Sequence, residues 1–327
     1  MATIKDVAKK AGVSITLVSR YINARKGVGA ESAQRIAAAI EELGYQPNTL
    51  ARSLVQGRTG TVAVLMDTLC SESHFPFIEG VEEGLADSGF IPIFLSGSTI
   101  ERKQRYFDEF SVGRVDGMIV IGALSVESSQ HSARGRALTL VDNRIPGLDA
   151  DIVYFDNRQG AYLLTRHMLR TRQWICHFSG GERSLAAFER EQGYRQAMLE
   201  SQGEDHVHVV ECGLNKKDGF ETMKRLLGKA LCPDAVLCST DEVAFGVIQA
   251  LLEHGKRVPE HVLVAGFGGG SDTQDPRYPS LTTVAMPMRE MGRDAAQLLL
   301  ARIANPDLPT QVREHMPRLL LRRSTRN

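Results

Sequence analysis

Residues 3–23, TIKDVAKKAGVSITLVSRYIN, decide how the rest of the chain is interpreted. Their pattern predicts two short helices joined by a tight turn. Thr3 can cap the first helix with Asp6 as its capping-box partner, and Gly12 can end it. The apolar positions follow the i, i+3, i+4, i+7 spacing of one buried face: Ile4, Val7, Ala8 and Ala11. Ser14 can cap the second helix. The stretch therefore predicts a helix-turn-helix.

The second helix has an unusual outer face, opposite the inward residues Leu17, Val18, Tyr21 and Ile22. That face has no carboxylate, which phosphate would repel, and consists of Ile15, Thr16, Ser19, Arg20 and Asn23. Arg20 suits the N7/O6 edge of guanine, Thr16 can hydrogen-bond a base edge, and Ile15 can pack on a thymine methyl group. We expect this helix to contact DNA bases. The alternative is a small helical hairpin with a solvated outer face.

Charge is unevenly distributed along the chain, although its formal net charge is zero. Residues 1–60 hold nine Lys/Arg and four Asp/Glu, a net charge of +5, so the remaining residues carry −5. A basic N-terminal module on an acidic body fits binding to a polyanion through one end only. Three polar side chains of the module suit phosphate oxygens, which fix the register on DNA without reading its sequence: Ser14, Ser19 and Asn23.

A third helix and a linker follow. Residues 31–43 have the periodicity of a helix that Gly44 can end. Pro47 blocks its continuation, and Asn48 can cap a short helix over about 49–55. Such a short helix should be marginal in isolation. We interpret residues 48–60 as a hinge that orders when a second copy and DNA are present, with Leu54 available as a minor-groove wedge. The alternative is an ordinary tether.

From Thr61 onward, apolar runs alternate with helical stretches. The predicted strands are 61–66, 91–96, 117–122, 137–142, 151–156, 174–179, 207–212, 234–239, 261–266 and 280–285. The predicted helices are 76–88, 100–112, 158–170, 185–201, 216–229, 241–254 and 287–304. Short strands that are apolar on both faces are typical of parallel sheets covered by helices. The pattern predicts a doubly wound α/β body with two lobes, whose ligand site lies beyond the carboxyl ends of the strands.

Composition sets further bounds. The chain has 327 residues, 43% hydrophobic and 24% charged, as in soluble globular proteins. Its five cysteines are scattered and form no C-x-x-C motif: Cys70, Cys176, Cys212, Cys232 and Cys238. Reduced thiols and a cytoplasmic location are therefore expected. The N-terminus has no apolar h-region, and no apolar stretch reaches membrane-spanning length, so neither a signal peptide nor a span is expected.

Motifs for catalysis, metal binding and nucleotide binding are weak. GFGGGSD (266–272) follows a strand, but Ser271 replaces the third glycine of the dinucleotide fingerprint. His206 and His208 do not complete a zinc shell. No G-x-S-x-G, P-loop or H-E-x-x-H is present. We therefore expect neither an enzyme nor a cofactor. Arg190, in FEREQGY (188–194), is either a solvated surface residue or a clamp on sugar hydroxyls or an anion.

The helix-turn-helix, RIAAAIEELGYQPN (35–48) and the α/β body together resemble the LacI/GalR family of bacterial transcription repressors. The resemblance covers nearly the whole chain. It implies base contacts by Ile15, Thr16 and Arg20, and phosphate contacts by Thr3, Ser14, Ser19, Asn23, Tyr45 and Asn48. It also implies that Leu54 wedges into the minor groove. Two positions depart from the usual motif, because Leu17 stands in place of a threonine and Gly29 in place of a serine cap.

The resemblance also implies an effector site between the lobes. The matching positions are His74, Phe77, Asp142, Arg190, Leu214, Thr240 and Gly268. Gly268 departs from the aspartate that usually grips sugar hydroxyls. A neutral sugar and a sugar phosphate are therefore nearly equal candidates for the effector. A phosphate group could be bound by Arg190, Arg144 and His74. The alternative effector is a purine-type corepressor, which the lack of stacking aromatics disfavours. The alternative function for the whole chain is a sugar-binding protein that does not bind DNA.

The expected organisation follows the family. Residues 1–47 form the helix-turn-helix domain, 48–60 the hinge and linker, and 61–327 the effector-binding and dimerisation domain, similar to periplasmic sugar-binding proteins. One lobe takes residues 61–157 and 287–313, and the other takes 158–284 and 314–327. The resemblance implies a homodimer on a palindromic DNA operator, and allosteric control of transcription by the effector. The chain has no leucine-heptad tail of the kind that forms tetramers in some relatives.

Overall fold

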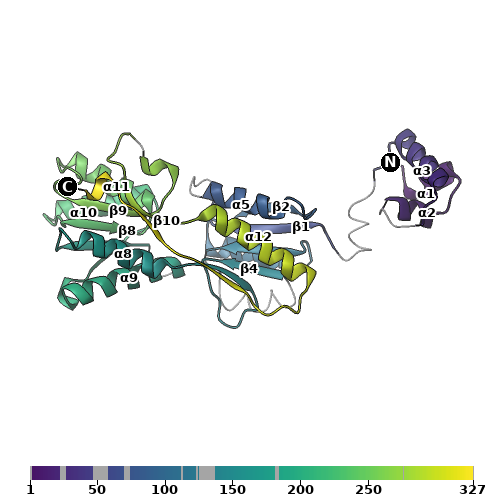
Figure 1. The fold of residues 1–327 in the computed structure, drawn as a ribbon. Coiled ribbons are helices and arrows are strands. Elements are labelled where there is room, and N and C mark those ends of the chain that lie inside the picture. Colours follow the sequence, from purple (N-terminus) through teal and green to yellow (C-terminus); the bar gives the residue numbers. More distant parts are fainter. Residues whose placement is uncertain are drawn as a thin grey trace. The chain divides into compact units, whose positions relative to one another are not determined.

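The computed structural model describes residues 2–22, 27–46, 58–69, 74–111, 113–122, 124, 137–180, 184–274 and 276–326. The chain falls into two compact units, Met1–Thr59 and Gly60–Asn327 (Figure 1). Three residues with predicted DNA contacts, Asn23, Asn48 and Leu54, lie outside the described residues, as does most of the predicted hinge.

The first unit is a three-helix core built from α1 (Ile4–Ala11), α2 (Ile15–Ile22) and α3 (Ala30–Leu43). The predicted capping box is present: Asp6 Oδ2 accepts from the Thr3 backbone N–H at 2.8 Å, and Thr3 Oγ1 accepts from the Asp6 N–H at 3.4 Å. Gly12 ends α1 in the left-handed region at φ 63°, where glycine is favoured. The buried core consists of Val7, Ala8, Ala11, Val18, Ile36 and Ala39. The helix-turn-helix prediction is confirmed.

The second unit contains two six-stranded sheets, the first in the order β11-β5-β4-β3-β1-β2 with every pair parallel. Its strands are β1 (Thr61–Met66), β2 (Ile91–Ser96), β3 (Gly117–Ile121), β4 (Ala137–Val141), β5 (Asp151–Phe155) and β11 (Val312–His315). The accompanying helices are α5 (Phe75–Leu85), α6 (Ile100–Ser111) and α12 (Met288–Ala304).

The second sheet has the order β12-β10-β9-β8-β6-β7, and only β12 is antiparallel to its neighbour. Its strands are β6 (Ile175–Ser179), β7 (His208–Glu211), β8 (Ala235–Cys238), β9 (Leu263–Gly268), β10 (Thr282–Ala285) and β12 (Arg318–Leu320). Its helices are α8 (Asn157–Met168), α9 (Leu185–Ser201), α10 (Lys216–Gly228) and α11 (Asp241–Glu253). The two-lobed α/β prediction is confirmed.

Helices α5 and α12 pack unusually closely because glycine removes side chains at their contact. A Cβ on Gly80 would lie 2.0 Å from the Arg289 carbonyl oxygen, and one on Gly292 would lie 2.3 Å from that of Phe77. Both distances are far below van der Waals contact, so neither position has room for a side chain. The late segment α12 is thereby fixed against the early segment α5, as Figure 1 shows.

The chain passes between the sheets at three places (Figure 1): after Phe155, after Ala285, and between His315 and Arg318. Strand β11, which ends at His315, was not predicted. It alternates exposed and half-buried residues at a sheet edge, so it lacks the apolar run that marks the other strands. Its last two residues lie in the first sheet, although the sequence analysis assigned them to the second lobe.

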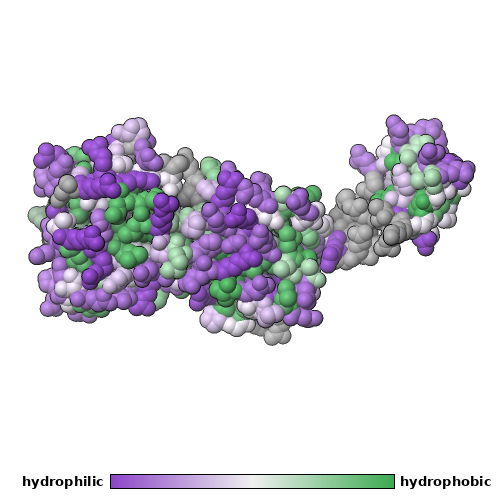
Figure 2. Space-filling view, in the orientation of Figure 1, coloured by the Kyte–Doolittle hydropathy of each residue, from purple (hydrophilic) through white to green (hydrophobic). Residues whose placement is uncertain are grey.

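Hydrophilic residues cover much of the visible face of both units, with hydrophobic residues in separate patches (Figure 2). Among the described residues, none of the helices has the length and hydropathy needed to span a membrane. The same residues include no group of three or more His, Cys, Asp or Glu arranged to hold a metal ion.

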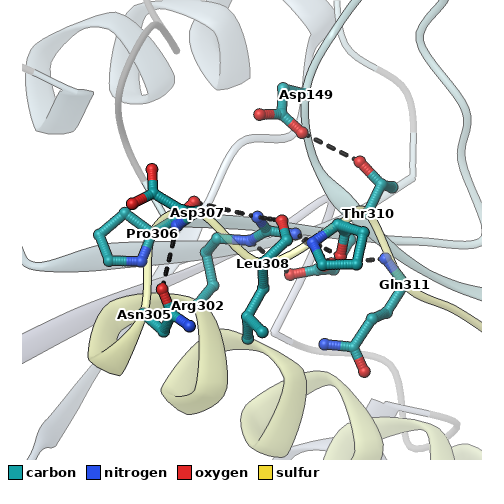
Figure 3. A network of polar contacts seen from close by, with 10 residues as sticks. Asp149, Arg302, Asn305, Pro306, Asp307, Leu308, Thr310 and Gln311 are labelled. Carbon is teal, nitrogen blue, oxygen red and sulfur yellow. Dashed lines mark hydrogen bonds and ion pairs between the residues drawn. The ribbon is translucent and has the colours of Figure 1, made fainter.

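A buried ion pair closes the end of α12 onto the first sheet. Arg302 donates to both carboxylate oxygens of Asp151, from Nε at 3.1 Å and from a terminal nitrogen at 2.8 Å. Arg302 also donates to the carbonyls of the loop that leads into β11, including those of Pro306 and Pro309 (Figure 3). The Asp151 side chain is fully buried and that of Arg302 is 7% exposed. The guanidinium therefore joins α12 to β5 and to this loop, which Thr310 and Gln311 also hold through hydrogen bonds to Asp149 and Asp151.

Replacing Arg302 with Met should destabilise the second unit by about 3–5 kcal/mol, because it leaves the Asp151 carboxylate buried and unpaired. Urea unfolding of the full chain measures this change. Arg105→Met is the control, since Arg105 and Glu109 are both exposed and such a pair is worth about 1 kcal/mol or less. If the two variants lose the same free energy of unfolding, the ion pair does not have this role.

Candidate functional site

The outer face of α2 is open in the way that base contact requires. Ile15 is 45% exposed although it is a large apolar residue, and Thr16 and Arg20 are exposed as well. Val18 on the opposite face is fully buried. Because the apolar core orients α2, the residues predicted to contact bases all face solvent from one short helix.

Four of the residues predicted to contact phosphate, Thr3, Ser14, Ser19 and Tyr45, lie in the described part of the chain and have local contacts there. Thr3 Oγ1 donates to Asp6 Oδ2 at 2.7 Å, and Ser14 Oγ accepts from the Leu17 N–H at 3.2 Å. Ser19 is half-buried, and Tyr45 packs against the three-helix core. Thr3 and Ser14 thus hold the ends of α1 and α2 in place.

A second set of side chains gathers where the chain first crosses between the sheets. We call it the polar cluster, consisting of Asp142, Arg144, Tyr154, Asn157, Glu189, Arg190, Ser239 and Asp241. Asn157, the first residue of α8, lies at its centre. Its Nδ2 donates to Asp142 Oδ1 at 2.7 Å, and its Oδ1 accepts from Arg190 Nε at 2.8 Å. One amide thereby links a residue after β4 to a residue of α9.

Arg190 is buried, with 8% of its surface exposed, so the interpretation as a solvated surface arginine is wrong. Besides Asn157, it donates to the Ser239 carbonyl at 2.7 Å, and its guanidinium lies 4.0 Å from the centre of the Phe267 ring. Burial lowers the pKa of Arg190, while nearby carboxylates oppose that shift: Asp142, Asp241 and Glu189. The guanidinium is held among negative groups and an aromatic face.

The pKa values of two carboxyl groups in the cluster, those of Asp142 and Glu189, are raised. Burial raises the pKa of Asp142, against the charge of Arg190 and the hydrogen bond from Asn157. Asp142 also has a positive φ of 51°, which is uncommon for a residue other than glycine and is found at functional sites. Burial, followed by the charge of Asp142, raises the pKa of Glu189. Raised carboxyl pKa values are typical of functional sites, so the cluster is a candidate site for a ligand that donates hydrogen bonds to carboxylates.

The Gly268 position has a carboxylate beside it, from Asp241. Asp241 Oδ2 accepts from the Gly269 N–H and Oδ1 from Thr283 Oγ1, both at 2.6 Å. A Cβ on Gly268 would lie 3.0 Å from Asp241 Oδ2. The carboxylate missing from position 268 is thus replaced nearby by one from the first turn of α11, although its oxygens already have partners.

The remaining predicted effector residues are placed differently. Thr240 Oγ1 donates to the Leu214 carbonyl at 3.0 Å and accepts from the Val243 N–H, so it caps α11, and Leu214 is 47% exposed. His74 Nδ1 lies 3.0 Å from the Thr68 carbonyl oxygen at the start of α5. Phe77 is fully buried in the apolar core. The structure brings Asp142 and Arg190 together, but Phe77 belongs to the packing.

The cluster residues that were not singled out from the sequence include Tyr154, Asn157, Glu189 and Ser239. The Arg144 guanidinium lies 4.2 Å from the Tyr154 ring centre. The hydroxyl of Tyr154 interacts with Glu189, whose charge contributes to raising the pKa of that hydroxyl after burial. Glu189 stands next to Arg190 in FEREQGY, and that adjacency was the available signal. Tyr154 lies within an apolar strand, where nothing in the pattern marks it.

His177 in β6 is buried, and the charge of Arg190 in the polar cluster acts on it. Its Nδ1–H donates to the Leu237 carbonyl at 3.1 Å, and its ring stacks on Tyr194. Burial is the main cause that lowers its pKa to about 4. Among the described residues, no partner meets its Nε2. His177 is therefore neutral in the folded protein at neutral pH.

Comparison with known proteins matches these two units to two families. Residues 3–48 match the model of bacterial regulatory proteins of the lacI family, and residues 170–325 match that of the periplasmic binding protein-like domain. The chain is 31% identical to the HTH-type transcriptional repressor PurR of Haemophilus influenzae (strain PittEE), over 100% of this chain and 99% of that protein.

Two solved structures have a similar fold over nearly the whole chain. The transcriptional regulator CelR in complex with cellobiose has a TM-score of 0.73 and 26% identity, covering 99% of this chain and 100% of that one. A lac repressor dimer bound to operator and the anti-inducer ONPF has a TM-score of 0.84 and 22% identity, covering 99% of both chains.

A helix-turn-helix unit followed by a periplasmic-binding-protein-like body defines a class of DNA-binding transcriptional repressors, which are not enzymes. The chain belongs to the lacI family of bacterial regulatory proteins.

The free energy of unfolding should fall in mild acid because of His177. Its folded-state pKa of about 4 lies below the ordinary 6.5, so between these values the unfolded chain binds a proton that the folded chain does not. The stability is complete above about pH 6.5 and falls by about 2 kcal/mol from about pH 7 to pH 5. Urea unfolding at both pH values measures it. His177→Gln should flatten this dependence, and the exposed His206→Gln should not; equal slopes in all three proteins would contradict the assignment.

Proposed function

We propose that this repressor binds a palindromic DNA operator as a homodimer, and that a neutral carbohydrate at the polar cluster controls its operator affinity. In this proposal residues 1–47 bind the major groove, 48–60 act as the hinge, and 61–327 bind the effector and form the dimer. Ile15, Thr16 and Arg20 read bases, and Thr3, Ser14, Ser19, Asn23, Tyr45 and Asn48 contact phosphates. Leu54 wedges into the minor groove. The protein then acts in the cytoplasm, where its operator lies.

The charge around Arg190 favours a neutral sugar over a sugar phosphate as the effector. Three carboxylates, from Asp142, Glu189 and Asp241, act on this one buried guanidinium. A phosphate dianion brought to Arg190 would be repelled by them, whereas neutral hydroxyls can donate to carboxylates and accept from the guanidinium. The relative CelR, whose structure is described with cellobiose, supports the same ligand class.

A purine-type corepressor is the alternative, since relatives with 31% identity are repressors named PurR. The aromatic rings near the cluster are poorly placed for stacking on a base. A guanidinium already lies over a face of the Phe267 ring and of the Tyr154 ring, and the Phe267 ring meets Phe155 edge-on at 6.0 Å. A purine would have to compete with these contacts.

The double variant Thr16→Ala/Arg20→Ala tests the DNA interface. Each lost base contact should cost about 1–3 kcal/mol, so the loss of two lowers affinity for the preferred duplex by about 30-fold or more, and affinity for scrambled DNA changes little. The preferred duplex is selected from a random pool and binding is measured by mobility shift. Arg225→Ala removes the same charge from an exposed position on α10 and should leave both affinities unchanged. Undiminished discrimination would favour a sugar-binding protein without DNA.

Calorimetric titration of the full chain tests the effector class, with cellobiose, glucose, ribose, glucose 6-phosphate and hypoxanthine as probes. We expect a neutral sugar to bind and to change operator affinity severalfold to about a hundredfold, the usual range of allosteric coupling. Arg190→Met should abolish sugar binding. Binding of glucose 6-phosphate or hypoxanthine, with no binding of neutral sugars, would overturn the carbohydrate assignment and leave the DNA assignment intact.

A further inference from the structure

Buried polar atoms without partners are few among the described residues, and two of them belong to residues that adjoin Arg190. In the described part of the chain, the buried side-chain atoms that accept or donate no hydrogen bond are Thr139 Oγ1, His177 Nε2, Glu189 Oε2, Gln202 Oε1 and Ser239 Oγ. Ser239 and Glu189 both adjoin Arg190: its guanidinium donates to the Ser239 carbonyl, and Glu189 precedes it in α9. Two unmet oxygens therefore belong to the polar cluster.

An unmet carboxylate oxygen in such surroundings is costly. A buried acceptor without a donor loses about 1–3 kcal/mol, and more when it is charged. Burial and the charge of Asp142 raise the pKa of Glu189, while hydrogen bonds with Tyr154 and Asn157 and the charge of Arg144 oppose that shift without supplying a donor to Oε2. Ser239 is fully buried, and Glu189 is half-buried. Such an arrangement persists where the missing donors come from a bound molecule.

We infer that Glu189 is a specificity-determining residue whose Oε2 accepts a hydrogen bond from a hydroxyl of the effector, with the Ser239 hydroxyl contacting the same ligand. The inference rests on the proposed carbohydrate site and deepens it.

The charge of Glu189 then explains selectivity as well as affinity. A hydroxyl or an ammonium group donates to the carboxylate, whereas a phosphate or carboxylate of the ligand is repelled by it. The Arg144 guanidinium, which lies 4.2 Å from the Tyr154 ring centre, offsets only part of this effect, because the pKa of Glu189 is still raised. Glu189 therefore selects donor-bearing neutral ligands against anionic ones.

The first arm of the test needs no ligand. Glu189→Gln keeps the side-chain shape and removes a charge that burial and Asp142 disfavour and whose Oε2 has no donor, so the melting temperature of the full-length free protein should equal or exceed the parent's, by up to about 4 °C. A lower melting temperature would show that the carboxylate supports the fold, and would overturn the inference. Glu191→Gln is the matched control on the same helix, because Glu191 pairs with Arg195 at 2.7 Å.

The second arm is calorimetric titration with the neutral sugar of the panel (cellobiose, glucose or ribose) that the parent binds. Glu189→Gln should weaken its binding about tenfold or more, Ser239→Ala about threefold, and Glu191→Gln less than twofold. Glu189→Gln should also reduce the ratio of the affinity for the neutral sugar to the affinity for glucose 6-phosphate. Parent-like affinity in Glu189→Gln would overturn the inference. If the parent binds no sugar, the proposed function fails, and the melting temperature alone decides the role of Glu189.

Discussion

The Asn157 amide is the contact on which the arrangement of the second unit depends. It accepts from Arg190 and donates to Asp142, so a residue that follows the first sheet and a residue that covers the second share one side chain. An amide is suited to this because it offers a donor and an acceptor together and carries no charge. Its position at the start of α8, directly after the first crossing, makes the polar cluster a meeting point of both lobes.

This contact gives a physical route from ligand to lobe arrangement. Any molecule that engages Arg190 or Asp142 alters the balance of charge and hydrogen bonding at a residue common to both lobes. The apolar core is also continuous here, because Phe155 meets Phe267 edge-on across the crossing. In packed lobes of this kind, a small local change at the cluster is converted into a change of arrangement.

The sequence predicted the helix-turn-helix and most strands of the body because their signals are local: capping residues, periodic apolar stripes and apolar runs buried on both faces. Strand β11 was missed because an edge strand with one covered face has no such run. Arg190 and Asp142 were recognised through the family resemblance. The role of Tyr154 and the burial of Phe77 could not be foreseen, because both depend on which segments the crossings bring together.

The return of α12 and β11 to the first sheet has a consequence for synthesis on the ribosome. Strand β5 gains its neighbour β11 only when residue 315 has emerged, and α5 lies uncovered until α12 arrives. The DNA-binding unit, by contrast, is complete within the first 59 residues. A nascent chain thus carries a folded N-terminal unit while apolar surface of its first lobe still lacks the cover of α12 and β11, and such exposed surface favours aggregation.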